Sequence, residues 1–150
     1  MKTYVFKIHI FRDEKIIREI EVLENSNLYK LAKAIVTAYN FSFDHAFGFF
    51  SDISEQWYKS EKKYELFADM KDMEPTGAKS VKKTKIGNVW KNPGDKMLFL
   101  FDYGDTWLFV VELIELGKKK LSKKYPSIVK KIGLAPEQYP EIEEYELPIA

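Results

Sequence analysis

The sequence predicts an α+β protein, in which one main helix packs on a mainly antiparallel sheet. Three patterns support this expectation. Near the start, residues 3–11 and 16–23 alternate apolar and polar side chains, as half-buried strands do. Apolar residues in 27–39 recur at the spacing of a helix. Two apolar runs, 97–103 and 106–116, flank a glycine–aspartate pair, which is a pattern typical of a β-hairpin.

The first two strands are expected to form an antiparallel hairpin around a polar turn at residues 12–15. In a strand, successive residues point to opposite faces of the sheet. This places the apolar residues of each strand on one face: Tyr4, Phe6, Ile8 and Ile10 in the first, Ile20 and Val22 in the second. The opposite face is more polar, so one face of the hairpin should contact the core.

The helix is expected at about 27–39, directly after this hairpin. Its apolar side chains at helical spacing are Leu28, Leu31, Ala32, Ile35 and Tyr39. Ser26 is the expected N-cap, because a hydroxyl can accept a hydrogen bond from the first free amides. Lys30 and Lys33 should face water. A third strand in 45–53 would complete a β-β-α-β opening, which is similar to a β-grasp arrangement.

Residues 54–96 give the weakest structural signal. One short strand is expected around 64–68 and one helical turn near 84–89. Residues 74–77 and the pair Pro93-Gly94 have the composition of tight turns. We expect the remainder of this stretch to be loop.

Residues 97–116 are predicted to form a C-terminal β-hairpin in the centre of the sheet. Because apolar residues fill both faces of its strands, both faces should be covered. Burial of each large side chain would contribute roughly 1.5–3 kcal/mol; the residues are Phe101, Trp107, Phe109 and Val111. At the turn, Gly104 is expected to supply a positive φ, and Asp105 and Thr106 to bond local backbone amides.

Composition limits the class of protein. A chain of 150 residues with 45% hydrophobic and 15% aromatic residues predicts one folded domain, 1–150, with a polar tail at about 133–150 that could be loosely ordered. The absence of cysteine excludes disulfides, thiolate nucleophiles and cysteine-bound zinc, and it suits a reducing cytoplasm. No signal peptide and no apolar run of about 18 residues is visible. We therefore expect a soluble, cytoplasmic protein that does not engage a membrane.

Charge is balanced overall but unevenly placed. The net charge of +1 gives no general attraction to nucleic acid or to anionic membranes. However, residues 118–131 contain seven lysines and no acid, and residues 137–146 contain five glutamates and no base. These segments are either two solvated faces that partly neutralise each other, or a basic patch for nucleic acid or an acidic partner that the acidic tail masks.

Two aspartates, Asp102 and Asp105, lie at the predicted turn and close to Trp107 in the sequence. Turn chemistry is the first interpretation of these residues. A ligand contact at the hairpin tip, together with His45, is the alternative. A metal site could join His45 and His9 with the aspartates. However, no HxH or HExxH spacing places two imidazoles on one face, so we assign no metal and no cofactor.

Other catalytic patterns are weak or missing in the sequence. Glu61 and Lys63 form an E-x-K pair after Asp52, as metal-dependent nucleases do, but the pair lies in a charged loop where chance matches are common. Neither a G-x-S-x-G nucleophile elbow nor a phosphate-binding glycine loop occurs. The sequence therefore gives no clear support for an enzyme and favours a protein that is not one.

Nucleic-acid binding has one set of candidates. Residues 79–91 interleave lysines with an apolar turn and a tryptophan, and residues 118–131 could add further lysines. The candidate residues are Lys82, Lys83, Lys85, Trp90, Lys119 and Lys123. Scattered aromatic residues in so aromatic a sequence more often belong to the core, which makes this the weaker interpretation.

The segment FDYGDTW (101–107) resembles the signature of the plasmid pRiA4b ORF-3-like family, in which the run Asp-aromatic-Gly-Asp is followed, after one residue, by a tryptophan. The segments FSFDHAFGFF (41–50) and YPSIVKKIGLAPEQYP (125–140) are similar to two further parts of that family. The resemblance covers nearly the whole chain. Many members carry a histidine where this sequence has Phe109, so a metal or catalytic role built on that histidine is not carried over.

The resemblance implies an uncharacterised protein with relatives on plasmids and mobile elements. Our first expectation is a small binding or interaction module, with another protein as its partner. The alternative is a metal-assisted enzyme or a nucleic-acid-binding or processing factor, which would use Asp102, Asp105 and His45. A DNA- or RNA-binding accessory that uses 79–91 and 118–131 is the third interpretation.

Overall fold

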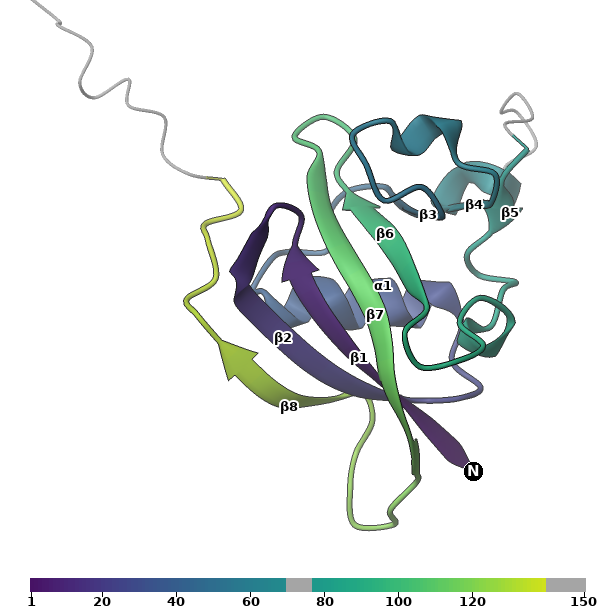
Figure 1. Ribbon diagram of the computed structural model, residues 1–150, viewed down its shortest axis with the longest axis vertical. Helices are drawn as coiled ribbons and strands as arrows, with labels where there is room; N and C mark the ends of the chain where they lie inside the picture. Colours follow the sequence, from purple (N-terminus) through teal and green to yellow (C-terminus); the bar gives the residue numbers. More distant parts are fainter. Residues whose placement is uncertain (70–76, 140–150) are drawn as a thin grey trace, which may run out of the picture.

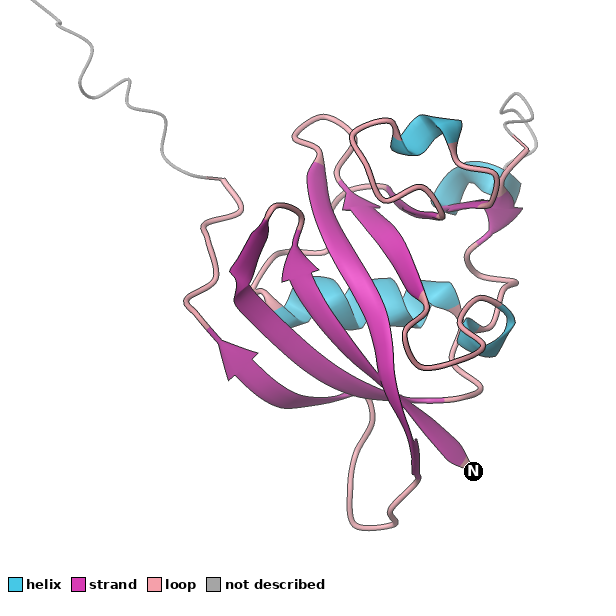
Figure 2. Cartoon of the chain, viewed as in Figure 1, coloured by secondary structure: helices cyan, strands magenta, loops and turns pink. Residues whose placement is uncertain are grey.

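The protein folds as one large, mostly antiparallel sheet with an α-helix across one face (Figures 1 and 2). The computed structural model describes residues 1–69 and 77–139, and all counts below refer to these residues. The strands are β1 (Lys2–Ile10), β2 (Asp13–Leu23), β3 (Phe47–Phe50), β4 (Lys63–Glu65), β5 (Lys79–Ser80), β6 (Lys96–Phe101), β7 (Trp107–Lys118) and β8 (Ser127–Ile132). The helix is α1 (Leu28–Ala38), and the 3-10 turns are η1 (Trp57–Lys59), η2 (Leu66–Asp69) and η3 (Ile86–Asn88). The eight strands follow the order β5-β4-β3-β6-β7-β1-β2-β8, and only the β4–β5 pair is parallel.

In the first hairpin, the pairing of the two strands places their apolar residues opposite one another, as the alternation of apolar and polar residues predicts. β1 and β2 pair antiparallel with Phe6 opposite Ile20, and both side chains are fully buried. β1 also pairs with β7, so the hairpin extends the sheet and contributes to its interior. The similarity of this opening to a β-grasp arrangement stays a prediction.

The helix α1 buries the predicted apolar stripe, while Lys30 and Lys33 are exposed. Its N-cap is Asn27 rather than the expected Ser26, because the Asn27 side chain accepts a 2.8 Å hydrogen bond from the Lys30 amide. The Ser26 carbonyl instead accepts a hydrogen bond from the Ile86 amide. This contact with the η3 turn holds Ser26 outside the helix, which starts one residue later than a serine cap would require.

The central strands β6 and β7 separate two apolar clusters. Phe99 and Phe109 belong to the larger cluster, which includes the buried side chains of α1. Leu98 and Leu100 belong to a smaller cluster on the other face. Partly buried side chains cover this smaller cluster: Phe11, Ile53, Trp57, Tyr103 and Leu108. Both faces of β6 are therefore covered.

Arg18 is a buried arginine that connects three elements. Its Nε donates to the Ala38 carbonyl at the end of α1, and its Nη1 donates to the Ile132 and Gly133 carbonyls at the end of β8. The guanidinium also lies 5.1 Å from the centre of the Tyr39 ring. A buried charge needs such acceptors, because an unpaired one is costly. Arg18 thus attaches β8 to the helix and to β2.

Several elements differ from the expectations. Where β8 forms, the sequence predicts only a polar basic segment, because lysines interrupt its apolar pattern. The third strand is limited to Phe47–Phe50, and the strand expected at 64–68 is Lys63–Glu65. The turn predicted at 74–77 lies almost entirely outside the described residues, which also end at 139 within the predicted polar tail. No helix within the described ranges is long and apolar enough to cross a membrane.

Candidate functional site

The turn between β6 and β7 is organised by the buried residue Asp102. Its Oδ1 accepts hydrogen bonds from the amides of Gly104 at 3.0 Å and Asp105 at 3.3 Å. Its carbonyl accepts from the Thr106 amide, and its own amide donates to the Ala46 carbonyl. Asp102 therefore satisfies the amides of the turn and links it to the residue before β3.

The positive φ angles of this turn are at Asp102 (68°) and Thr106 (54°), and not at Gly104 as expected. Aspartate tolerates this conformation because its side chain can bond amides further along the turn. A Cβ at Gly104 would lie 3.3 Å from Asp102 Oδ1, so the glycine allows a close approach. The expected amide contacts of Asp105 and Thr106 are also wrong: Thr106 Oγ1 donates to the Tyr103 carbonyl, and Asp105 is exposed.

The second carboxylate oxygen of Asp102 faces His45. Asp102 Oδ2 lies 3.4 Å from His45 Nε2, which is also 2.6 Å from the Tyr139 hydroxyl. That hydroxyl donates to Asp44 Oδ2 at 2.9 Å. In the contact between His45 Nε2 and the Tyr139 hydroxyl, the donor is set by the tautomer of His45. We call Asp44, His45, Asp102 and Tyr139 the His45 cluster.

The His45 cluster attaches the C-terminal segment to the rest of the molecule. Desolvation, the hydrogen bond to Asp44 and the neighbouring carboxylates together raise the pKa of Tyr139 to about 12. Tyr139 is therefore a neutral donor at physiological pH. Next to it, Gln138 accepts from the Ser42 amide and donates to the Ser42 carbonyl. These bonds hold residues 138–139 against the loop before β3.

The chemistry of the His45 cluster is that of hydrogen bonding. Within residues 1–69 and 77–139, no group of three or more histidine, aspartate and glutamate side chains is arranged to hold a metal ion. The His45 ring already contacts Tyr139 and Asp102 through Nε2. The cluster is suited to fixing the position of a chain segment.

The other two predicted tip residues have different surroundings. Asp105 is exposed at the end of the turn. Trp107 packs against Phe41, with 4.8 Å between ring centres, and is partly buried. Its Nε1 atom is buried and has no hydrogen-bond partner in the described part of the chain. The structure thus joins His45 with Asp102 but keeps Trp107 in an apolar contact.

Sequence reasoning missed Asp44, Gln138 and Tyr139 as members of this site. Asp44 carried a weak signal, since it precedes His45 directly. Tyr139 lies 94 residues after His45, and no local pattern could connect the two.

The nucleic-acid candidates differ in exposure. Trp90 is fully buried, and its Nε1 donates to the Val111 carbonyl at 3.1 Å, so it cannot stack on a base. Lys123 is partly buried and bonds Glu21 Oε1 at 2.6 Å. The exposed candidates are Lys82, Lys83, Lys85 and Lys119.

We call residues 118–131 the basic segment; it comprises the end of β7, a loop that projects beyond the sheet, and most of β8 (Figure 1). Two of its seven lysines are ion-paired, Lys123 with Glu21 and Lys130 with Glu19. The other lysines form no ion pair with the described residues. Its exposed apolar side chains are Leu121 (100% exposed), Ile128 (41%) and Val129 (44%).

Comparison with known proteins gives a fold neighbour and a family. The crystal structure of MM3350 from Methanosarcina mazei Go1, a protein of unknown function, is similar with a TM-score of 0.72 and 23% identity, over 97% of this chain and 86% of that chain. This likeness shows a shared fold. A search of the curated proteins gives no match. The family model described as plasmid pRiA4b ORF-3-like protein matches residues 2–148, and the chain therefore belongs to the plasmid pRiA4b ORF-3-like family.

Proposed function

We propose that this protein is a small cytoplasmic binding module, and that its basic segment docks an acidic surface of a protein partner. One observation supports this most strongly. Five lysines without an ion pair among the described residues lie in the same segment as the exposed side chains of Leu121, Ile128 and Val129. Such a segment attracts an acidic partner and offers it apolar area to bury.

The mixture of charge and apolar area favours a protein over nucleic acid. Protein interfaces combine a desolvated apolar centre with a polar rim. Contact with a phosphate backbone depends mainly on Lys and Arg charges and gains little from an exposed leucine. The burial of Trp90 further removes the aromatic platform expected for single-stranded nucleic acid.

The test measures binding of the full chain to a synthetic peptide of alternating glutamate and leucine, and in parallel to a short DNA duplex. The variant Lys119→Glu/Lys120→Glu/Lys124→Glu reverses three exposed lysines of the basic segment. We expect it to lose at least about tenfold in peptide affinity, or ~1.4 kcal/mol. The matched control is Lys59→Glu/Lys62→Glu/Lys91→Glu, which changes the net charge equally at exposed positions elsewhere.

The control variant should lose less than about threefold in affinity for the peptide, since distant exposed charges are largely screened. Equal losses in the two variants would show a general charge effect and contradict docking at the basic segment. Tighter binding to DNA than to the peptide, with a steep loss as salt rises, would replace the protein partner with nucleic acid.

A metal-assisted enzyme or nucleic-acid-processing factor is the alternative, because His45 and Asp102 are in contact. Titration with Zn²⁺ followed by calorimetry tests it. Our proposal predicts no difference between the unmodified chain and His45→Gln. Saturable binding that His45→Gln and Asp102→Asn both abolish would favour the enzyme instead.

A further inference from the structure

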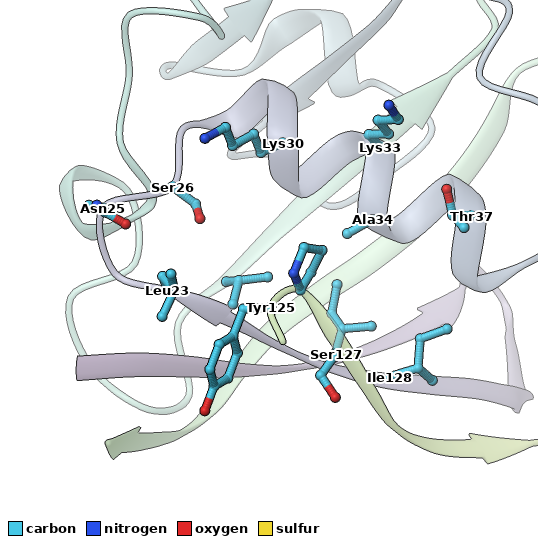
Figure 3. Close-up of a pocket in the computed structure, with 13 residues that line it drawn as sticks. Leu23, Asn25, Ser26, Lys30, Lys33, Ala34, Thr37, Tyr125, Ser127 and Ile128 are labelled. Carbon is cyan, nitrogen blue, oxygen red and sulfur yellow. The ribbon is translucent and has the colours of Figure 1, made fainter. Parts of the chain in front are cut away.

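A cleft of about 490 Å³ opens between the outer side of α1 and the start of β8 (Figure 3). Its apolar wall includes Ile20 and Val22 from β2 and Ala34 from the helix. Pro126 and Ile128 extend the wall formed by β2, because Ile128 lies beside Ile20 in the pairing of β2 with β8. This volume is in the range of sites that hold small molecules.

The cleft exists because small helix residues face the edge of the sheet. Leu31 and Ile35 fill the core beneath α1 and are fully buried. On the neighbouring side of the same helix, Ala34 and Thr37 line the cleft. Their small side chains leave the space above β2 open. A larger side chain at either position would enter this space.

The charge at the cleft is of one sign. The charged residues that line it are Lys30 and Lys33, which Figure 3 shows on the helix side, and neither has an ion pair with any described residue. Alternation along β2 turns Glu19 and Glu21 to the opposite face from Ile20. There they pair with Lys130 and Lys123. The lining of the cleft therefore includes two lysines and no carboxylate.

Tyr125 lines the cleft as well, and its hydroxyl accepts a hydrogen bond from the Lys120 amide. Three lining residues carry aliphatic hydroxyl groups: Ser26, Thr37 and Ser127. Within the described part of the chain, none of these side chains has a hydrogen-bond partner. An apolar wall with a few polar groups and a positive rim is the composition of a site for a ligand with an apolar body and an anionic head.

We propose that this cleft binds small amphipathic anions, such as a carboxylate on a medium-length acyl chain. The acyl chain packs between the sheet and the helix. Ile20, Val22, Pro126 and Ile128 contact it from the sheet, and Ala34 contacts it from α1. The carboxylate lies at the rim, where Lys30 and Lys33 approach it as ammonium donors. This site shares no residue with the lysines substituted in the test of partner docking.

The test compares three probes with the same chain length: octanoate and octylammonium below their micelle concentrations, and octanol below its solubility limit. Binding to the full chain is followed by two-dimensional NMR of the backbone amides. We expect octanoate to bind more tightly than octanol by at least about fivefold, and octylammonium to bind least. The shifted amides should fall in residues 20–37 and 125–128.

Two kinds of variant test the two halves of the site. Lys30→Gln/Lys33→Gln should reduce octanoate affinity to that of octanol, while Lys59→Gln/Lys62→Gln should change it by less than about twofold. Ala34→Phe should fill the cleft and reduce the affinity for both octanoate and octanol by at least about tenfold. Thr37→Trp, at an exposed rim position, tests the same point should Ala34→Phe fail to fold.

Equal affinity for octanoate and octylammonium would overturn the proposal, and so would unchanged octanoate binding in both cleft-filling variants. The outcome is separable from partner docking. Lys119→Glu/Lys120→Glu/Lys124→Glu should still bind octanoate at this cleft even if it no longer binds the acidic peptide.

Discussion

At the scale of single residues, Asp102 links a tight turn to the C-terminal segment. One carboxylate oxygen accepts the amides of Gly104 and Asp105, and the other faces His45. Its positive φ is stabilised by these local bonds. The bonds to Gly104 and Asp105 are turn chemistry, and the ligand contact at the hairpin tip stays a prediction.

Substitution of Asp102 should separate these roles. Asp102→Asn keeps an oxygen acceptor and tolerates positive φ, so the free energy of unfolding should fall by less than about 1 kcal/mol. Asp102→Ala leaves two turn amides without their partner and should cost about 2–3 kcal/mol. Urea unfolding measures both values. Equal losses would show that charge, and not the turn bonds, is what Asp102 supplies.

Alkaline pH should weaken the fold through its tyrosines. Burial raises the pKa of Tyr39, burial and Glu65 raise that of Tyr103, and the pKa of Tyr139 is raised to about 12. Since the folded pKa values lie above the ordinary 10.0, the folded state favours the neutral phenol. This stabilisation is complete below pH 10 and is lost as pH rises towards and beyond 12.

Urea unfolding at several pH values tests this expectation. The free energy of unfolding should fall steeply above about pH 10, and Tyr139→Phe should make the fall between pH 10 and 12 shallower. A profile that stays flat to pH 12 would contradict the burial and bonding described for these hydroxyl groups.

At the scale of elements, local patterns predicted the parts of the fold whose side chains repeat regularly. The alternation in β1 and β2 and the helical spacing of Leu28 to Tyr39 lie within single segments. β8 could not be found in this way. Its bonds to Arg18 join residues 114 and 115 positions apart, and its pairs with β2 join residues more than 100 positions apart. The same limit applies to Tyr139 in the His45 cluster.

Arg18 should therefore control the attachment of β8. Arg18→Met removes its bonds to the Ala38, Ile132 and Gly133 carbonyls. The free energy of unfolding should fall by about 3 kcal/mol, and amide hydrogen exchange should accelerate in β8 before the rest of the sheet. The exposed Arg12 provides the control Arg12→Met. Unchanged exchange in β8 would contradict this role.

At the scale of the whole molecule, β7 connects the two surfaces considered for function. It begins beside the Asp102 turn and ends at the basic segment (Figure 1). Twelve residues of strand extend roughly 40 Å, so ligands at the two ends would perturb different amides. The sequence identified both ends, through the FDYGDTW segment and the lysine run. It could not show that Trp90 is core or that a cleft lies beside β8.

The most direct test of partner docking is the NMR map of the full chain titrated with the acidic glutamate–leucine peptide. The basic-segment proposal predicts saturable shifts concentrated in residues 118–131, which Lys119→Glu/Lys120→Glu/Lys124→Glu removes. Shifts concentrated instead at His45 and residues 102–107, or no saturable shift at low salt, would contradict it.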